Sequence, residues 1–125
     1  MATNFESLVV WQKSHELTLK IYEITKVFPK EEIFGITSQI RRSVHSIPAN
    51  IVEGRKKSTT AHKLSFLSHS IGSLEEVKYF LLLSRDLGYI TQTIYDEIFP
   101  LTEEIGRLLN GYEKFIKNDN FGSKT

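Results

Sequence analysis

The sequence predicts an all-α fold, an antiparallel up-and-down four-helix bundle. Apolar residues recur at steps of three and four through four segments, which is the spacing of one helix face. The connections between these segments are short, so consecutive helices are expected to run antiparallel. No segment shows the alternation that is typical of a strand. The 125 residues form one expected domain, 1–125, that is long enough to bury a core.

The first helix is expected at about residues 7–28, and Pro29 should end it because proline disfavours helix in the residue before it. Its core face comprises Val10, Ser14, Leu17, Ile21, Ile24 and Phe28. The second helix is expected at about residues 32–55, and Pro48 inside it should bend it. Its core face comprises Ile36, Ile40, Val44, Ile47 and Ile51.

The third helix is expected at about residues 59–87, with small residues at Ser70, Gly72 and Ser73 where a neighbouring helix could approach. Its core face comprises Leu64, Leu67, Ile71, Leu74, Val77, Phe80 and Leu81. Gly88 is expected to adopt the left-handed conformation that ends many helices.

The fourth helix is expected at about residues 91–117, with Thr91 as its N-cap. A heptad pattern predicts a core face of Ile94, Ile98, Leu101, Ile105, Leu108, Tyr112 and Phe115. Pro100 should kink or briefly break this helix, and the polar residues 118–125 are expected to form a loose tail.

Composition excludes several classes of protein. No apolar run approaches the ~18–20 residues that span a bilayer, and the first residues lack the pattern of a secretory signal. The chain has no cysteine, which excludes disulfides and thiolate chemistry and is consistent with a cytoplasmic location. No membrane partner is therefore expected.

The net charge of +1 hides an uneven distribution of charge. Residues 36–63 carry six Arg and Lys side chains against Glu53 alone, a net +5, and residues 86–113 carry six acidic side chains against Arg107 alone, a net −5. Such a split suggests an anionic partner, or subunits that meet unlike face to unlike face. The alternative interpretation is two solvated helix faces.

The second helix also carries a polar stripe beside its apolar face, formed by Gln39, Ser43, Ser46, Asn50 and Glu53. Buried polar groups need partners, so we expect a network between helices or subunits, with Arg42 reaching Glu53 or another acid. The alternative is that the stripe lines the edge of the bundle and meets water. The candidate residues for nucleic-acid binding are Arg41, Arg42, Arg55, Lys56, Lys57 and Lys63, because Arg and Lys contact phosphate. A solvated basic face is the competing interpretation.

No pattern predicts catalysis, a cofactor site or a metal site. The chain has no nucleophile elbow and no glycine-rich phosphate loop, and its four histidines do not form a metal-binding motif. One remote alternative is a ribonuclease, since some all-α ribonucleases of the HEPN superfamily use an Arg and a His about as far apart as Arg55 and His62.

The segment from Gln39 to Gly54, QIRRSVHSIPANIVEG, resembles the pattern Q-x-R-R-x-x-x-S-I-P-x-N-I-x-E-G of the 23S rRNA intervening-sequence protein family. The segments 8–13, 28–32, 72–76 and 87–89 are similar to other parts of that family, so the resemblance covers nearly the whole chain. It implies a small, cytoplasmic, bacterial four-helix bundle without established catalytic activity that assembles into a homopentameric ring. The resemblance also extends to the accessory proteins of diversity-generating retroelements, which bind nucleic acid and a reverse transcriptase. The net charge of only +1 departs from that basic branch.

The leading hypothesis is a non-catalytic homo-oligomer that binds structured RNA or DNA, or an enzyme that acts on nucleic acid. A purely structural ring-forming module is the alternative, in which the basic and acidic stretches face each other between subunits.

Overall fold

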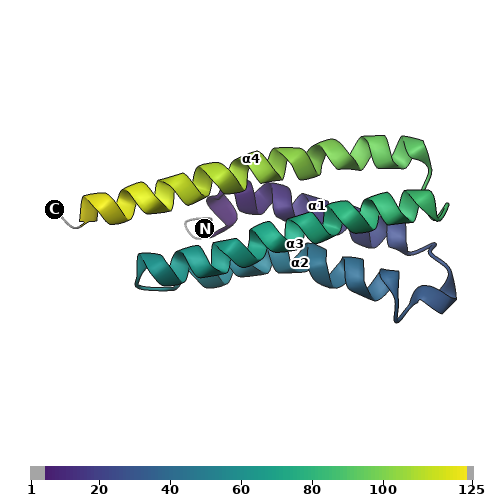
Figure 1. The fold of residues 1–125 in the computed structure, drawn as a ribbon, viewed down its shortest axis with the longest axis horizontal. Helices are drawn as coiled ribbons and strands as arrows, with labels where there is room; N and C mark the ends of the chain where they lie inside the picture. The colour runs from purple at the N-terminus through teal and green to yellow at the C-terminus, as the bar shows by residue number, and fades with distance from the viewer. Residues whose placement is uncertain (1–4, 124–125) are drawn as a thin grey trace.

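The computed structural model describes residues 5–123, with side chains described for residues 5–118. It contains four α-helices: α1 (Val9–Thr25), α2 (Ile36–Arg55), α3 (Thr60–Asp86) and α4 (Gln92–Ser123). Two short 3-10 turns, η1 (Phe5–Ser7) and η2 (Lys30–Glu32), precede α1 and α2. The start of α1, the α2–α3 turn and the end of α4 lie at one end of the molecule (Figure 1). We call this end the basic end. The opposite end, which carries the α1–α2 and α3–α4 turns, is called the far end.

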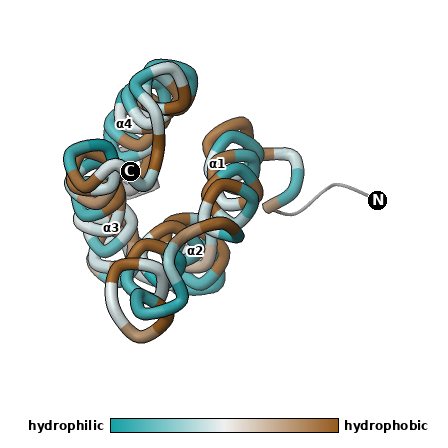
Figure 2. Tube along the Cα trace, turned by 90° about the vertical axis from the view of Figure 1, so that its right-hand side faces the viewer, coloured by the Kyte–Doolittle hydropathy of each residue, from teal (hydrophilic) through white to brown (hydrophobic). Residues whose placement is uncertain are grey.

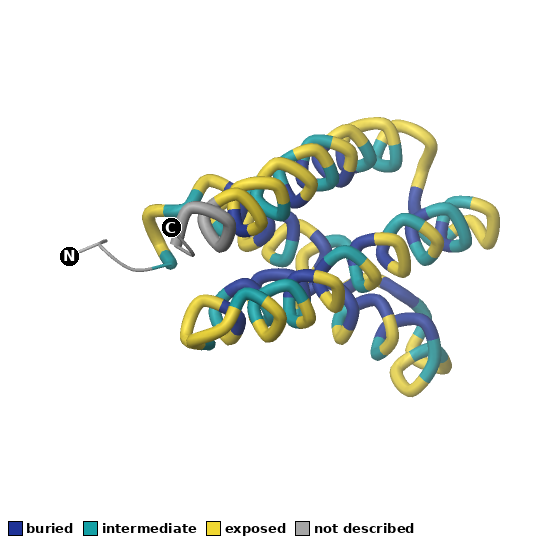
Figure 3. The backbone as a smooth tube through the Cα atoms, turned by 60° about the vertical axis from the view of Figure 1, so that its left-hand side comes forward, coloured by how far each residue is buried: buried dark blue, intermediate teal, exposed yellow. Residues whose placement is uncertain are grey.

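The four helices form the predicted all-α bundle. Each helix packs against its neighbours in the chain, and α1 closes the arrangement against α4. Viewed along the bundle, the helices occupy four corners in chain order (Figure 2). Buried positions lie on the sides of the helices that face one another (Figure 3). The side chains with the least exposure include Leu17, Ile21, Ile40, Ile47, Ile51, Leu74, Leu81, Ile105 and Leu109.

The first two helices start later than the sequence predicts. The expected helix at 7–28 is the turn η1 followed by α1 at Val9–Thr25. The expected helix at 32–55 begins instead at Ile36, because Gly35 has a non-helical backbone (φ −109°, ψ −122°). Glu32 lies outside the helix, and its Oε1 accepts a hydrogen bond from the Ile36 amide at 3.2 Å. The acidic residue therefore caps α2 from the preceding turn.

Pro48 is buried inside α2, and the helix continues past it to Arg55. Proline has no N–H to donate, so the carbonyl of Val44 loses its usual partner one turn later. The hydroxyl of Thr18 on α1 lies 3.3 Å from that carbonyl oxygen. The same hydroxyl lies closer, at 2.8 Å, to Ser14 O of its own helix, so its single proton is shared between the two carbonyls and replaces the missing donor only in part.

The turn between α3 and α4 confirms the prediction for Gly88. Gly88 has φ +78°, in the left-handed region that glycine adopts without steric cost. Its amide donates to Arg85 O at 3.0 Å, and the Tyr89 amide donates to Ser84 O at 2.8 Å. These two bonds form a Schellman motif, which satisfies carbonyls at the end of α3.

Helix α4 departs from three predictions. Pro100 does not interrupt it, and its backbone stays helical from Gln92 to Ser123, so residues 118–123 are not a loose tail; residues 124–125 lie outside the described residues. Its core face after Ile105 is Leu109 and Ile116, whereas Phe115 is exposed. A straight α-helix repeats every ~3.6 residues rather than every 3.5, so a strict heptad drifts away from the core.

Candidate nucleic-acid interface

The basic end is built where α2 stops and α3 starts. Gly54 is buried there, and a Cβ atom at this position would lie only 3.1 Å from the Cβ of Phe66. Glycine therefore permits the two helix ends to approach closely. Arg55 is the last residue of α2, Lys56 is its C-cap, and Lys63 lies in the first turn of α3. Arg55 and Lys56, at the C-terminal end of α2, also complement the negative end of its helix dipole.

The four cationic side chains of this turn, Arg55, Lys56, Lys57 and Lys63, form what we call the basic cluster. Arg55 and Lys56 are exposed. The Lys57 ammonium lies 5.0 Å from the centre of the Phe66 ring, and the Lys63 ammonium donates to the Arg55 carbonyl at 3.4 Å. Among the residues with described side chains, none of the four forms an ion pair with a carboxylate. The cluster therefore presents uncompensated positive charge.

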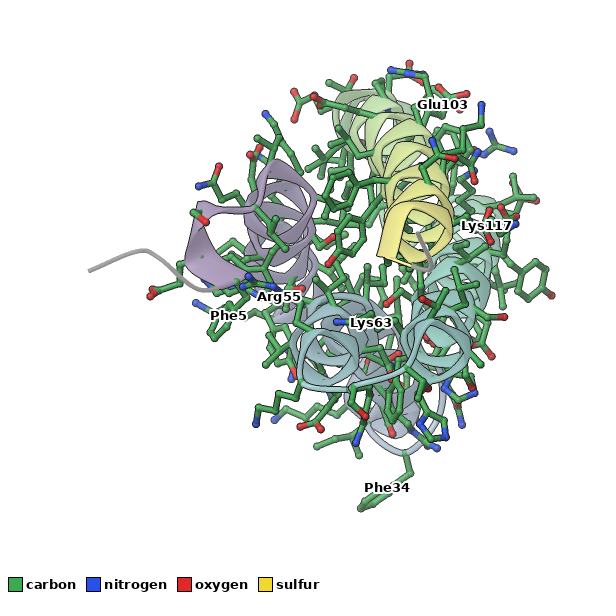
Figure 4. The ribbon with its side chains drawn as sticks, turned by 90° about the vertical axis from the view of Figure 1, so that its left-hand side faces the viewer. Phe5, Phe34, Arg55, Lys63, Glu103 and Lys117 are labelled. Carbon is green, nitrogen blue, oxygen red and sulfur yellow. The ribbon has the colours of Figure 1, made fainter. Side chains whose placement is uncertain are left out.

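The end of α4 lies at the same end of the molecule as the basic cluster (Figure 1). Figure 4 views the molecule from this end and shows Arg55 and Lys63 near each other, with Lys117 of α4 on another side. Burial raises the pKa of Tyr112 above its ordinary value, and the nearby charge of Arg55 opposes that rise. Arg55, Lys63 and Tyr112 also border one small cavity of about 10 Å³. Helix α4 thus runs beside the basic cluster.

Lys114 and Lys117 are both exposed on this part of α4 and were not among the residues predicted from the sequence. They are far from residues 36–63 in the chain. The antiparallel topology was the signal that could have found them, because it returns the end of α4 to the α2–α3 turn.

Arg41 and Arg42 do not belong to this surface. Arg41 is half-buried against α1: its Nε donates to Thr25 Oγ1 at 2.8 Å, and its guanidinium lies 4.8 Å from the centre of the Tyr22 ring. Arg42 is exposed, but it precedes Arg55 by about 20 Å along the helix axis at 1.5 Å per residue. The six candidate residues therefore separate into a cluster of four, one isolated cation and one arginine bound to α1.

The predicted polar stripe contacts α3 through its serines. Ser43 Oγ donates to Glu76 Oε1 at 3.3 Å, and the hydroxyls of Ser46 and Ser73 share a short hydrogen bond. The Asn50 amide donates within its own helix to Ser46 O at 2.8 Å.

The two ends of the stripe behave differently from its centre. Gln39 and Glu53 are exposed, and no ion pair joins Arg42 to Glu53 within the described residues. The small residues predicted on α3 do face a neighbouring helix: Ser70 is buried and its hydroxyl donates to Ile47 O of α2 at 2.8 Å.

The structure offers little for the other chemistries. His62 is exposed in the first turn of α3, and the cavity beside Arg55 does not include it. Within the described part of the chain, no three His, Asp or Glu side chains are grouped so that they could hold a metal ion. Across the same residues, no helix has both the length and the apolar character that crossing a membrane requires.

Comparison with known proteins agrees with this architecture. The family model for the 23S rRNA-intervening sequence protein matches residues 6–111. A crystal structure of a protein of unknown function from the S23 ribosomal protein family of Bacteroides thetaiotaomicron is similar, with a TM-score of 0.78 and 32% sequence identity, over 85% of this chain and 99% of that one. No curated protein matches the chain. This four-helix chain belongs to the 23S rRNA-intervening sequence protein family.

Proposed function

We propose that this protein is a non-catalytic, homo-oligomeric bundle of the bacterial cytoplasm that binds structured RNA or DNA through its basic end. The observation that carries the proposal is the basic cluster, Arg55, Lys56, Lys57 and Lys63, which has no carboxylate partner among the described side chains. Lys114 and Lys117 are further exposed cations at the same end of the molecule, on the α4 side. Such a surface attracts phosphates by charge and by release of counterions.

The mode of recognition follows from the residue types. The cluster contains one arginine and three lysines, with no exposed aromatic side chain in the α2–α3 turn for a base to stack on. It therefore favours the phosphate backbone, and its selectivity should come from the shape of a folded RNA or DNA rather than from base edges.

The test compares charge reversal at the basic end with charge reversal elsewhere. The first variant carries Arg55→Glu, Lys56→Glu and Lys57→Glu. The control carries Lys20→Glu, Lys30→Glu and Arg107→Glu, which changes net charge equally at exposed cations of other surfaces. Fluorescence anisotropy with a structured rRNA fragment, at several salt concentrations, measures affinity and salt dependence.

We expect the first variant to bind at least about a hundredfold more weakly, because three cations lose their phosphates and gain repulsion. Its plot of log K against log salt should also be flatter, by about 2 to 3 in slope. The control should retain most of the affinity. Equal loss in both variants would mean that net charge alone is responsible, and unchanged affinity in the first variant would refute the proposal.

A nucleic-acid enzyme, such as a reverse transcriptase, is a second kind of partner for the same surface. Pull-down of a purified reverse transcriptase, with and without nuclease treatment, distinguishes direct binding from bridging by nucleic acid. Binding that survives nuclease and is lost in the triple Glu variant would assign the basic cluster to the enzyme.

A structural ring-forming module is the second candidate function. Exposed apolar side chains at the far end favour it: Val27, Ile33 and Phe34 all lie in the α1–α2 turn. In such a module the basic stretch 36–63 of one subunit faces the acidic stretch 86–113 of the next, head to tail, a geometry that closes into rings such as a homopentamer. Light scattering after gel filtration tests this candidate, and a monomer at micromolar concentration would refute it. The two functions compete, since cations buried between subunits are unavailable to phosphate.

Ribonuclease activity of Arg55 and His62 has a direct test. Incubation with a panel of RNAs should give no cleavage, or the same trace cleavage in wild type and His62→Ala. Cleavage that disappears in His62→Ala would make the protein an enzyme.

A further inference from the structure

Three aromatic rings follow one another at the start of α1, and we call them the aromatic ladder. Phe5 of η1 meets Trp11 edge-on, with ring centres 4.9 Å apart and an angle of 62° between the planes. His15, one turn later, lies parallel to Trp11, with ring centres 4.9 Å apart and an angle of 10°. Phe5 and Trp11 are half-buried, whereas His15 is exposed. The last ring of the ladder is therefore open to solvent.

Local contacts hold the ladder in place. The Leu8 amide donates to Phe5 O at 3.0 Å, and Gln12 Nε2 donates to Glu6 O at 2.8 Å. Both bonds fasten η1 to the start of α1, which keeps Phe5 against Trp11. Trp11 also packs against the hydrophobic core. Because its central ring is already fixed, the ladder loses little further side-chain entropy when another ring stacks on it.

The ladder lies on the side of α1 that faces α2. Trp11, His15 and Thr18 follow one another at steps of four and three residues, so they share one helix face. The Thr18 hydroxyl lies 3.3 Å from Val44 O of α2, which shows where this face points. The exposed ring of His15 is therefore beside α2, the helix that ends in the basic cluster.

Arg55 brings positive charge to the start of the ladder. The turn η1 packs against α2, and the view from the basic end shows Phe5 next to Arg55 (Figure 4). Arg55 is exposed and forms no ion pair with a carboxylate among the described side chains. A cation for phosphate and rings for bases are the two components of a site for unpaired nucleotides.

The acidic side chains near the ladder do not cancel this charge. Glu16 pairs with Lys13 at 3.8 Å, and Lys13 also pairs with Glu104 of α4 at 3.9 Å, so this pair faces α4 rather than α2. Glu6 adjoins Phe5 in the chain, and the four cations of the basic cluster outweigh its single charge.

We propose that the aromatic ladder binds an unpaired base of the nucleic acid whose phosphates contact the basic cluster, an inference that rests on the proposed function. The base stacks on the face of His15 turned away from Trp11 and so adds one ring to the ladder. Stacking uses the face of a base and not its edge, so the site accepts any base. The preferred ligand is therefore a folded stem with an unpaired end or loop, because the bases of a continuous duplex are already stacked on one another.

The test compares one RNA hairpin in three forms: blunt, with a short single-stranded overhang of adenosines, and with an overhang of abasic nucleotides of the same length. The two overhangs carry the same phosphates and differ only in their bases. Fluorescence anisotropy measures the affinities at several salt concentrations. The emission of Trp11, the only tryptophan of the chain, reports on the ladder itself.

We expect the adenosine overhang to bind about fivefold or more tightly than the abasic overhang, and to quench Trp11 where the abasic overhang does not. The ratio of the two affinities should not change with salt, because both ligands carry the same charge. Equal affinities and unchanged emission, with hairpin binding intact, would overturn the ladder and leave the basic cluster as a phosphate site. Absence of binding by all three forms would overturn both proposals.

Variants at an exposed residue of the ladder locate the base without touching the core. His15→Ala should remove most of the preference for the adenosine overhang, whereas His15→Phe, which keeps an aromatic ring without a charge, should retain it. His69→Ala is the matched control, because His69 is also exposed but lies on α3 and meets the Phe66 ring edge-on. It should leave the preference unchanged. A preference that survives His15→Ala, or that both alanine variants reduce equally, would refute the site.

Discussion

At the scale of single residues, hydroxyl groups rather than ion pairs connect α2 to α3. Ser70 donates to Ile47 O, Ser43 donates to Glu76, and Ser46 bonds to Ser73. Small side chains let the two helices approach closely enough for such contacts. A buried hydroxyl is satisfied at short range by a carbonyl, at a lower desolvation cost than a charge.

Two buried serines of α3 test this interpretation as a matched pair. Ser70 donates across to α2, whereas Ser84 donates to Phe80 O within its own helix. Ser70→Ala should lower the free energy of unfolding by about 1 kcal/mol, and Ser84→Ala should change it by less than half as much, because a bond back into the same helix adds little. Urea denaturation measures both. Equal effects would show that the contact with α2 is not special.

Tyr89 links the two turns of the far end and should make stability depend on alkaline pH. Its hydroxyl donates to Glu32 Oε2 at 2.7 Å. This hydrogen bond, followed by burial and the charges of Glu32 and Glu31, raises the pKa of Tyr89 above 10.0. The folded state therefore favours the protonated phenol, so the contribution is complete below about pH 10 and is lost as pH rises through the raised pKa.

Urea midpoints measured between about pH 9 and about pH 11 test the contribution of this tyrosine. Wild type should lose stability more steeply over this range than Tyr89→Phe. The control is Tyr79→Phe, at an exposed tyrosine of α3, and it should follow wild type. The same slope in Tyr89→Phe and wild type would contradict the linkage to Glu32.

At the scale of elements, two exceptions to helical regularity have specific causes. Pro48 leaves the Val44 carbonyl without its helical donor, and the Thr18 hydroxyl approaches it from α1. Gly88 ends α3 because its positive φ lets the chain reverse while two carbonyls of the helix remain bonded.

Alanine substitutions at two glycines distinguish the effect of backbone conformation on stability from the effect of steric crowding. A Cβ would meet nothing within 4 Å at Gly88 or at Gly72, but only Gly88 has a positive φ. Gly88→Ala should destabilise the protein by about 1 kcal/mol, because L residues are strained there. Gly72→Ala, in the interior of α3, should stabilise it by up to about 1 kcal/mol through helix propensity. Thermal or urea unfolding measures the change in the free energy of unfolding for each variant. Changes of the same sign in both variants would contradict this account.

At the scale of the whole molecule, the topology places different kinds of surface at the two ends. The basic cluster and the exposed lysines of α4 lie at one end, while the exposed apolar side chains of the α1–α2 turn lie at the other. The far end carries charges of both signs: Glu31 and Glu32 lie beside Lys26 and Lys30 in the α1–α2 turn, and Asp86 follows Arg85 at the end of α3. The acidic stretch of the sequence runs along α4, with Glu103, Glu104 and Glu113 well beyond its start, so it is not confined to one end of the bundle.

The exposed turn at the far end makes a prediction about assembly. The Phe34 side chain is 92% exposed, and it projects from the bundle (Figure 4). If this turn is buried between subunits, Phe34→Ser should weaken self-association by about tenfold or more, while changing the stability of the isolated bundle by less than about 0.5 kcal/mol. Analytical ultracentrifugation measures the association. Leu19→Ser, at an exposed site in the middle of α1, is the control, and equal weakening by both would disprove a specific role of the turn.

The sequence by itself determined the class of fold, the four helices, most of the core and the family. These depend on local spacing and on a long motif in α2, both of which can be read along the chain. It also identified Gly88 as the end of α3, since only glycine enters the left-handed region freely. The predicted starts of α1 and α2 and the predicted end of α4 were less accurate. The non-helical backbone of Gly35 and the helical backbone of residues 118–123 depend on the surrounding structure as well as on residue type.

The tertiary structure alone decided which charged residues share a surface. Arg41 and Arg42 are neighbours of the same type, yet the crossing of α1 over α2 ties Arg41 to Thr25 and leaves Arg42 in solvent. The same topology brings Lys117 to the end that carries Arg55. Helical periodicity gives the face of a residue but not its neighbour on another helix, because that depends on how the helices pack in three dimensions.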